Sequence, residues 1–223
     1  MSLYSETIAL IRKEILLEWR QRFALNGILL YLGSIVFICY LSLGVKTNGL
    51  SPIVWNALFW IILLFTSVNA VAKSFMQEKA SRLFYYYSIT SAKSVIISKI
   101  IYNAGLMLLL SLIGFLFYSL VLGNPVKDQS LFLMNIVLGA IGFSCTFTMV
   151  SGIASKAGGN ATLMAILSFP IILPLLLLLI KISKNAMDGL NRGSSWDEVI
   201  MLLAINVMIT ALSYILFPYL WRS

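Results

Sequence analysis

The sequence predicts an all-α integral membrane protein with six transmembrane helices in a single membrane domain that covers residues 1–223. Hydrophobic residues make up 60% of the chain and charged residues only 11%. The apolar residues occur in long unbroken runs, which is typical of membrane proteins and not of a soluble core. Since lipid-exposed backbone must satisfy its own hydrogen bonds and the alternating pattern of a membrane β-barrel is missing, we expect these runs to be helices.

Six runs are long enough to cross a hydrocarbon core of about 30 Å, which takes about 20 helical residues. They cover residues 24–43, 53–72, 95–122, 131–154, 162–180 and 199–220, and they define a six-helix unit over residues 24–220. The connections GVKTNGLSP, GNPVKDQS and SKAGGNA are short and rich in Gly, Pro, Asn and Ser. Such connections favour turns between neighbouring antiparallel helices.

The basic residues predict which side of the membrane each helix end faces. The chain has no histidine and a formal net charge of +8, with Lys and Arg at the ends of the apolar runs. This distribution favours membrane topology and headgroup contact over nucleic-acid binding. One set of ends holds Arg12, Lys13, Arg20, Arg22, Lys73, Lys79, Arg82, Lys93, Lys99, Lys156 and Arg222, and the other holds Lys46, Lys127, Lys181, Lys184 and Arg192. The positive-inside rule therefore predicts that both termini are cytoplasmic.

Residues 3–22 carry too many charges to span a membrane and predict an amphipathic helix at the membrane interface. On a helix, an apolar stripe is formed by Tyr4, Ile8, Ile11, Ile15 and Trp19, and the charges of Glu6, Lys13, Glu14 and Arg20 lie away from it. The same pattern suits a surface anchor and a helix that binds a partner protein, and the sequence leaves both open.

The residues needed for several kinds of chemistry are missing. The sequence contains no GxxxxGK[ST] phosphate loop, so we do not expect it to hydrolyse ATP itself. Apart from Lys99, near the end of the run at 95–122, no charged residue lies within an apolar run, which disfavours an ion-coupled carrier. Without histidine or an activated nucleophile there is little from which to build an enzyme site. Cys39 and Cys145 lack metal-ligand spacing, so the sequence predicts neither a metal site nor a cofactor that this chain would bind alone.

Two polar features interrupt the apolar runs. We expect hydrogen bonds between helices from the asparagines Asn26, Asn56, Asn69, Asn103, Asn135 and Asn206. In SFPIILPLLLLLI, Pro170 and Pro174 stand one turn apart, and each removes a backbone donor. Because freed carbonyl groups need protein or water around them, the prolines favour a kinked helix that faces the bundle interior and borders a transport pathway; a kink without function is the alternative.

A charged and tyrosine-rich segment, MQEKASRLFYYYSITSAK, covers residues 76–93 between the second and third runs. It is longer and more polar than a turn requires, and its Ala, Leu, Met and Gln residues favour a short helix at the cytoplasmic surface. Its candidate functional side chains are Glu78, Lys79, Arg82, Tyr85, Tyr86 and Tyr87. Tyrosines and arginine suit an interfacial aromatic belt as well as a protein-docking surface, so both interpretations stay open.

This arrangement resembles the membrane subunits of type-2 ABC exporters, and over nearly its whole length the chain is similar to the haem exporter B family of cytochrome c maturation permeases. That family carries an acidic-Gly-Thr-Leu stretch, then Ser-Pro, and a Lys eleven residues after that Ser. The acidic, Thr, Ser and Lys positions are occupied by Glu78, Ser81, Ser88 and Lys99, while Ala80, Arg82 and Ile89 replace the Gly, Leu and Pro. The family's Pro-x-x-x-Pro spacing is kept by Pro170 and Pro174, after a Gly-containing turn like KAGGNA.

The resemblance implies a bacterial inner-membrane permease subunit, acting as a homodimer, that couples ATP hydrolysis on a separate ABC subunit to haem export or to release of a haem-loaded chaperone. By this likeness the ATP-binding subunit grips the coupling element at residues 76–93, with Lys99 behind it. Haem would be a transported or complex-bound ligand, ATP would bind the partner, and a haem-handling membrane protein, a haem chaperone and membrane lipids would be further partners. A permease for another amphiphile, such as a lipid or drug, and a scaffold that transports nothing remain as alternatives.

Overall fold

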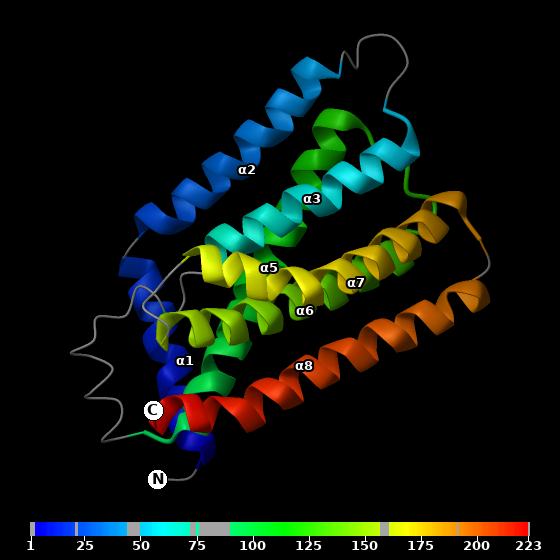
Figure 1. The fold of residues 1–223 in the computed structure, drawn as a ribbon. Helices are drawn as coiled ribbons and strands as arrows, with labels where there is room; N and C mark the ends of the chain where they lie inside the picture. Colours follow the sequence, from blue (N-terminus) through cyan, green and yellow to red (C-terminus); the bar gives the residue numbers. More distant parts are fainter. Residues whose placement is uncertain are drawn as a thin grey trace.

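The computed structural model describes residues 3–20, 22–43, 50–71, 75, 90–156, 161–190 and 192–222, and within these ranges all regular structure is helical (Figure 1). The helices are α1 (Leu3–Arg20), α2 (Arg22–Ser42), α3 (Pro52–Val71), α5 (Ala92–Leu122), α6 (Gln129–Lys156), α7 (Ala161–Asp188), the short 3-10 helix η1 (Arg192–Ser195) and α8 (Trp196–Arg222). Six of them, α2, α3 and α5 to α8, are long and apolar enough to cross a membrane. The predicted fold class is confirmed.

Several helices extend beyond the predicted apolar runs. α7 differs most, because it continues past residue 180 through Lys181 and Lys184 to Asp188. α5 likewise begins at Ala92 rather than at residue 95. An apolar run shows which part of a helix can lie in hydrocarbon. The helix itself can continue beyond that run, because its backbone hydrogen bonds also form in more polar surroundings. Helix length and span length are therefore different quantities in this chain.

The six candidate spans run in alternating directions, and α1 lies at the same end of the bundle as the last turn of α8 (Figure 1). We call this end the terminus end and the opposite one the far end. The start of α5 and the last turn of α6 also lie at the terminus end, and the connections at residues 123–128 and 189–195 lie at the far end. α1 crosses the terminus end instead of continuing the direction of α2 (Figure 1).

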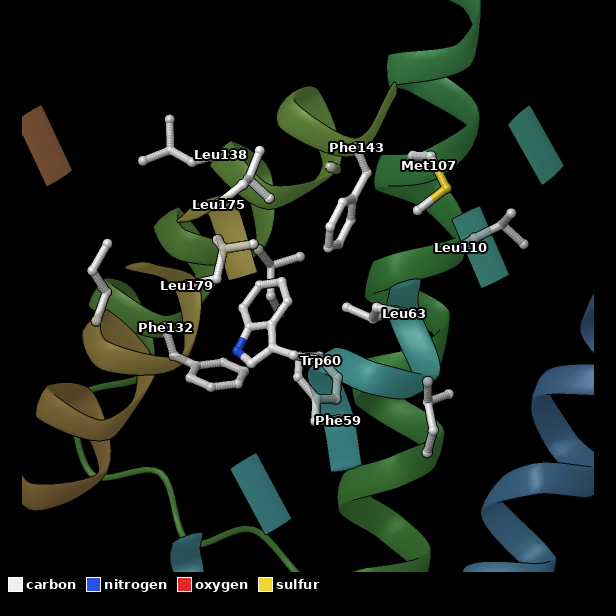
Figure 2. Close-up of a cluster of buried hydrophobic side chains, with 14 of the residues drawn as sticks. Phe59, Trp60, Leu63, Met107, Leu110, Phe132, Leu138, Phe143, Leu175 and Leu179 are labelled. Atoms are coloured by element: carbon white, nitrogen blue, oxygen red, sulfur yellow. The ribbon is translucent and has the colours of Figure 1, made fainter. Parts of the chain in front are cut away.

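α6 is the central helix of the bundle. Of the residues in its candidate membrane span, 83% are buried within the protein, compared with 11% for α2 and 28% for α8. It packs against α3, α5, α7 and α8. Two glycines allow α3 and α7 to pack closely against α6. A Cβ on Gly139 would lie 2.7 Å from the ring of Trp60, and one on Gly142 would lie 2.4 Å from Cδ1 of Leu175. Figure 2 shows Trp60 enclosed by aromatic and aliphatic side chains of its neighbours.

Buried polar side chains connect these helices, as the sequence predicted for its asparagines. Four amides donate across helix boundaries: Asn56 to the carbonyl of Ile180 (2.8 Å), Asn103 to Oγ1 of Thr148 (2.8 Å), Asn135 to the carbonyl of Leu179 (2.8 Å) and Asn206 to the carbonyl of Leu138 (3.0 Å). Ser183 of α7 also accepts from the indole of Trp60 at 2.8 Å. By contrast, Asn69 donates to the carbonyl of Phe65 in its own helix, and Asn26 is exposed. α7 is therefore bound to α3 and α6 by directional contacts as well as by packing.

Replacing Gly142 with alanine is expected to destabilise the bundle by about 1–3 kcal/mol, because the new methyl group would overlap Leu175 and Asn206. Thermal unfolding of the purified protein in mild detergent measures the effect. Gly105→Ala is the matched control, since nothing lies within 4 Å of a Cβ at that position and alanine favours a helix. A melting temperature for Gly142→Ala as high as that of Gly105→Ala would contradict the close packing.

Candidate functional site

Most of the predicted coupling element lies outside the described residues. This applies to Glu78, Lys79, Arg82, Tyr85, Tyr86 and Tyr87. The structure does describe the chain on both sides of these residues, with Phe75 before them and Thr90, Ser91 and α5 after them. Lys99, the last member of the predicted set, lies in α5. The candidate site is the group of contacts that hold these two flanks in place.

Phe75 is fixed at the terminus end by contacts with three helices. Its backbone N–H donates to Oγ of Ser151 in α6 at 3.2 Å. Its ring packs on Phe217 of α8 with centroids 5.2 Å apart. Nζ of Lys99 in α5 lies 4.7 Å from the ring centroid, which is a cation–π distance. Together these contacts leave Phe75 only 3% exposed and anchor the chain just before the coupling element.

The other flank is held by Glu6 of α1. Ser91 is the N-cap of α5, where its Oγ accepts from the N–H of Ser94 at 3.2 Å. Oε2 of Glu6 accepts from the N–H and Oγ of Ser91, at 3.3 and 3.1 Å, and from Oγ of Ser94 at 2.8 Å. A carboxylate at this position also suits the positive end of the helix dipole. α1 is thus attached to the residue at which the chain enters α5.

Lys99 connects the two flanks. The residue is only 2% exposed, and its Nζ donates to Oε1 of Glu14 in α1 at 3.3 Å. Lys13 approaches the same carboxylate oxygen at 2.9 Å. The Lys99 ammonium also lies over the ring of Phe75. One buried charge therefore connects α5, to which Lys99 belongs, with α1 and with the flank of the coupling element.

A third glutamate completes the attachment of α1 to α5. The hydroxyl of Tyr102 donates to Oε2 of Glu18 at 3.2 Å. The glutamates at positions 6, 14 and 18 are separated by multiples of four, so they share one face of α1, with buried Leu10 between them. We call this set the α1–α5 joint; it comprises Glu6, Glu14, Glu18, Phe75, Ser91, Ser94, Lys99 and Tyr102.

The glutamates are the site residues that sequence reasoning missed. The helical pattern separated the charged residues of α1 from its apolar stripe, but it did not show that the acidic face contacts α5. In the structure Ile8, Ile15 and Trp19 are exposed, Ile11 is partly buried, and the acidic face meets the bundle. The signal was the polar start of α5, where donors occur at helical spacing at Ser91, Ser94, Ser98, Lys99 and Tyr102.

The pKa values of the three glutamates respond to different surroundings. Hydrogen bonds from Ser94 and Ser91 hold the pKa of Glu6 below its usual 4.5. Burial alone would raise the pKa of Glu14, but the charges of Lys99 and Lys13 outweigh it and the pKa is lowered. The pKa of Glu18 is raised, mainly by burial. The hydrogen bond from Tyr102 acts in the opposite direction, and the negative charge of the nearby Glu14 adds to the increase. Glu6 and Glu14 are therefore carboxylates at neutral pH.

The prolines of α7 lie on its outer face. Pro170 and Pro174 are exposed, whereas Ile172, Leu175 and Leu179 are buried. α7 continues as one helix through both prolines. The proline face thus turns away from the interior of the single chain, unlike the arrangement that the sequence suggested, because the branched aliphatic side chains occupy the contact with α6.

Other reactive groups are scattered. In the ranges that the structure describes, no three His, Cys, Asp or Glu side chains come together as metal ligands. Cys39 and Cys145 are free thiols, and Sγ of Cys145 lies 3.3 Å from Oγ1 of Thr210. Among the described residues, the predicted site residue Lys99 lies in the polar cluster that forms the α1–α5 joint.

Replacing Lys99 with methionine is expected to destabilise the protein by about 3 kcal/mol, because Glu14 loses a buried partner while staying largely enclosed. The double variant Lys99→Met/Glu14→Gln should recover a large part of that loss, since no buried charge is left without its partner. Thermal unfolding of the four proteins in mild detergent gives the coupling energy. Lys184→Met, at an exposed position of α7, is the control. Additive losses in the double variant would contradict the ion pair.

The joint is expected to loosen in acid. The lowered pKa values of Glu6 and Glu14 contribute stability that is fully present above their unfolded value of 4.5 and is lost as the pH falls through the lowered folded values. The raised pKa of Glu18 acts in the opposite direction, because it favours the protonated form. Melting temperatures between neutral pH and about pH 3 should fall less for Glu14→Gln than for Glu18→Gln. Superimposable pH profiles for these two variants would rule out this assignment.

Comparison with protein-family models matches residues 5–219 to one family, described as "CcmB protein". Comparison with curated proteins gives no match. The matched range extends from the first turn of α1 almost to the end of α8, so it contains the α1–α5 joint and all six candidate membrane spans. Members of this family are the permease subunits of the haem-exporting ABC system for cytochrome c maturation, and their nucleotide-binding site is on a partner subunit. The chain therefore belongs to the CcmB family, the haem exporter B family that its sequence resembles.

Proposed function

We propose that this permease subunit is moved by ATP hydrolysis on a separate ABC subunit, and that the movement drives either the export of haem or the release of a haem-loaded chaperone outside the cytoplasm. The observation that carries the proposal is the position of Lys99. This buried residue pairs with Glu14 of α1 and lies over Phe75, at the flank of the coupling element. A movement of the coupling element would therefore be transmitted through Lys99 directly to α1 and α5.

The α1–α5 joint supports transmission from both flanks. Displacement of Phe75 would act on α6 through Ser151, on α8 through Phe217 and on α1 and α5 through Lys99. Displacement of Ser91 would act on α5 directly and on α1 through Glu6. Because close-packed helices move as rigid bodies rather than deforming, such displacements would reach the membrane-embedded part of the bundle.

The coupling element is the proposed contact with the ATP-binding subunit. Its arginine and tyrosines are residue types that dominate protein–protein hot spots. In this proposal Arg82 and Tyr85 to Tyr87 supply the docking surface, and Glu78 and Lys79 add charged contacts at its edge. Lys99 acts behind this surface as a positioning residue within the joint.

Both termini are proposed to be cytoplasmic, in the bacterial inner membrane. An ATP-binding partner reaches the coupling element only if the terminus end faces the cytoplasm. The basic residues of this end include Arg12, Lys13, Arg20, Lys93, Lys99 and Lys156, and those of the far end include Lys127, Lys181 and Lys184. This difference favours the same orientation under the positive-inside rule.

A second copy of the chain is the proposed cover for the proline face of α7. Pro170 cannot donate to the carbonyl of Ile166, and Pro174 cannot donate to the carbonyl of Pro170. Around these carbonyl groups Ile166 and Phe169 are 67% and 62% exposed. Freed carbonyls are costly against lipid, whereas a packed protein surface shields them. A homodimer through this face would provide that surface.

Haem is the proposed cargo because of the role of the family. The chain has no histidine, so imidazole ligation of the iron would have to come from another subunit, and contact with this chain would be apolar and aromatic. We therefore include a haem-handling membrane protein and a haem chaperone among the proposed partners.

The test replaces Arg82 and Tyr86 with alanine and measures ATP hydrolysis by the isolated complex and c-type cytochrome formation in cells. The variant should insert normally and lose cytochrome formation at least about ten-fold, since two hot-spot side chains are removed from the contact. Lys184→Ala/Tyr219→Ala removes an exposed lysine and an exposed tyrosine elsewhere and should behave as the unmodified protein. Unchanged cytochrome formation in the Arg82/Tyr86 variant would contradict the coupling role.

Two further results separate the alternative functions. Deletion of the gene should abolish c-type cytochromes; normal cytochromes with impaired lipid or drug efflux would assign another amphiphile as cargo. Nucleotide should change the protease sensitivity of residues 76–89 in the isolated complex. Protease sensitivity that stays constant through ATP binding and hydrolysis would favour a scaffold.

A further inference from the structure

The outward face of α1 has a charge pattern that the joint itself creates. α1 contains the charged residues Glu6, Arg12, Lys13, Glu14, Glu18 and Arg20. All three glutamates accept hydrogen bonds from α5 or its N-cap. Lys13 lies beside Glu14 at 2.9 Å, whereas Arg12 and Arg20 are exposed. The acidic side chains are thus occupied at the bundle, and the exposed charge of α1 is positive.

The same outward face is apolar. Tyr4 and Trp19 are 75% and 70% exposed, and Leu16 is 56% exposed. A shallow, open groove of about 630 Å³ lies along this face, and the described residues that line it all belong to α1; they include Tyr4, Ile8, Ala9, Arg12, Leu16 and Arg20. Aliphatic and aromatic side chains combined with arginines are the composition of helices that bind anionic membrane surfaces.

Two candidate membrane spans begin close to the ends of α1. The candidate span of α2 begins at Leu25, shortly after Arg20 at the end of α1. α5 begins at Ala92, next to Ser91, which Glu6 holds near the start of α1. Both ends of α1 are therefore close to the start of a helix that is long and apolar enough to cross a membrane. This placement fits the interfacial position that the sequence predicts for α1.

We propose that this groove binds the phosphate groups of anionic phospholipids in the adjoining leaflet, with Arg12 and Arg20 as the phosphate-binding residues. A guanidinium group presents paired donors that match phosphate oxygens. The aliphatic part of each arginine lies along apolar surface while its head stays at the phosphate, and Ile8 and Leu16 meet the upper acyl chains. The inference rests on the interfacial position that the sequence predicts for α1 and is independent of the proposed ATP-driven movement.

The experiment uses the full chain, spin-labelled at Ala9→Cys after replacement of Cys39 and Cys145 by serine, in nanodiscs. One set contains phosphatidylcholine alone and the other phosphatidylcholine with about a third phosphatidylglycerol. Power saturation reports the access of a water-soluble nickel chelate and of oxygen to the label. Phosphatidylglycerol should reduce nickel access several-fold, and Arg12→Gln/Arg20→Gln should remove this difference. Lys127→Gln/Lys184→Gln, which removes two exposed charges at the far end, should retain it.

Three results would overturn the proposal in different ways. A label shielded equally in both lipids would show apolar attachment without an anionic site and would leave the interfacial position intact. A label open to nickel in both lipids would refute that position as well. A label shielded only after addition of the ATP-binding subunit would assign the groove to a protein partner.

Discussion

The buried ammonium group of Lys99 imposes the constraint on which the terminus end depends. A charge that is 2% exposed must keep a partner, and here Glu14 of α1 supplies it while the ring of Phe75 supplies a second favourable surface. α1 cannot leave α5 without exposing Lys99 or stranding its charge. The contacts of Glu6 and Glu18 extend this pairing along the helix, so that the amphipathic segment becomes part of the bundle.

The bundle behind the joint is suited to pass movement on. α6 lies at its centre, and its glycines bring α3, α7 and α8 within close contact. Amide side chains then fix α7 and α8 to α6 at defined carbonyl groups. Rigid helices joined by directional bonds change position relative to one another instead of bending. A displacement of Phe75, which contacts α5, α6 and α8, therefore acts on helices that cross the membrane.

The fold could be predicted from the sequence because hydrocarbon thickness sets the length of an apolar run, and six runs met it. Four asparagine contacts could be expected because few other partners exist for an amide in an apolar bundle. The role of the glutamates could not be seen, because an acidic helix face suits water as well as the polar start of a neighbouring helix. The outward position of Pro170 and Pro174 depends on tertiary packing that spacing does not encode. Lys99 was singled out as a candidate through its family motif, while its pairing with Glu14 required the structure.

The most direct measurement is affinity purification of the tagged chain from its native membranes in mild detergent, with mass-spectrometric identification of its partners and an assay of ATP hydrolysis. The account predicts recovery of an ATP-binding ABC subunit with measurable hydrolysis, together with haem-handling membrane proteins. Absence of any ATP-binding subunit, under conditions that keep other membrane complexes intact, would contradict the claim that this permease is moved by an external ATPase.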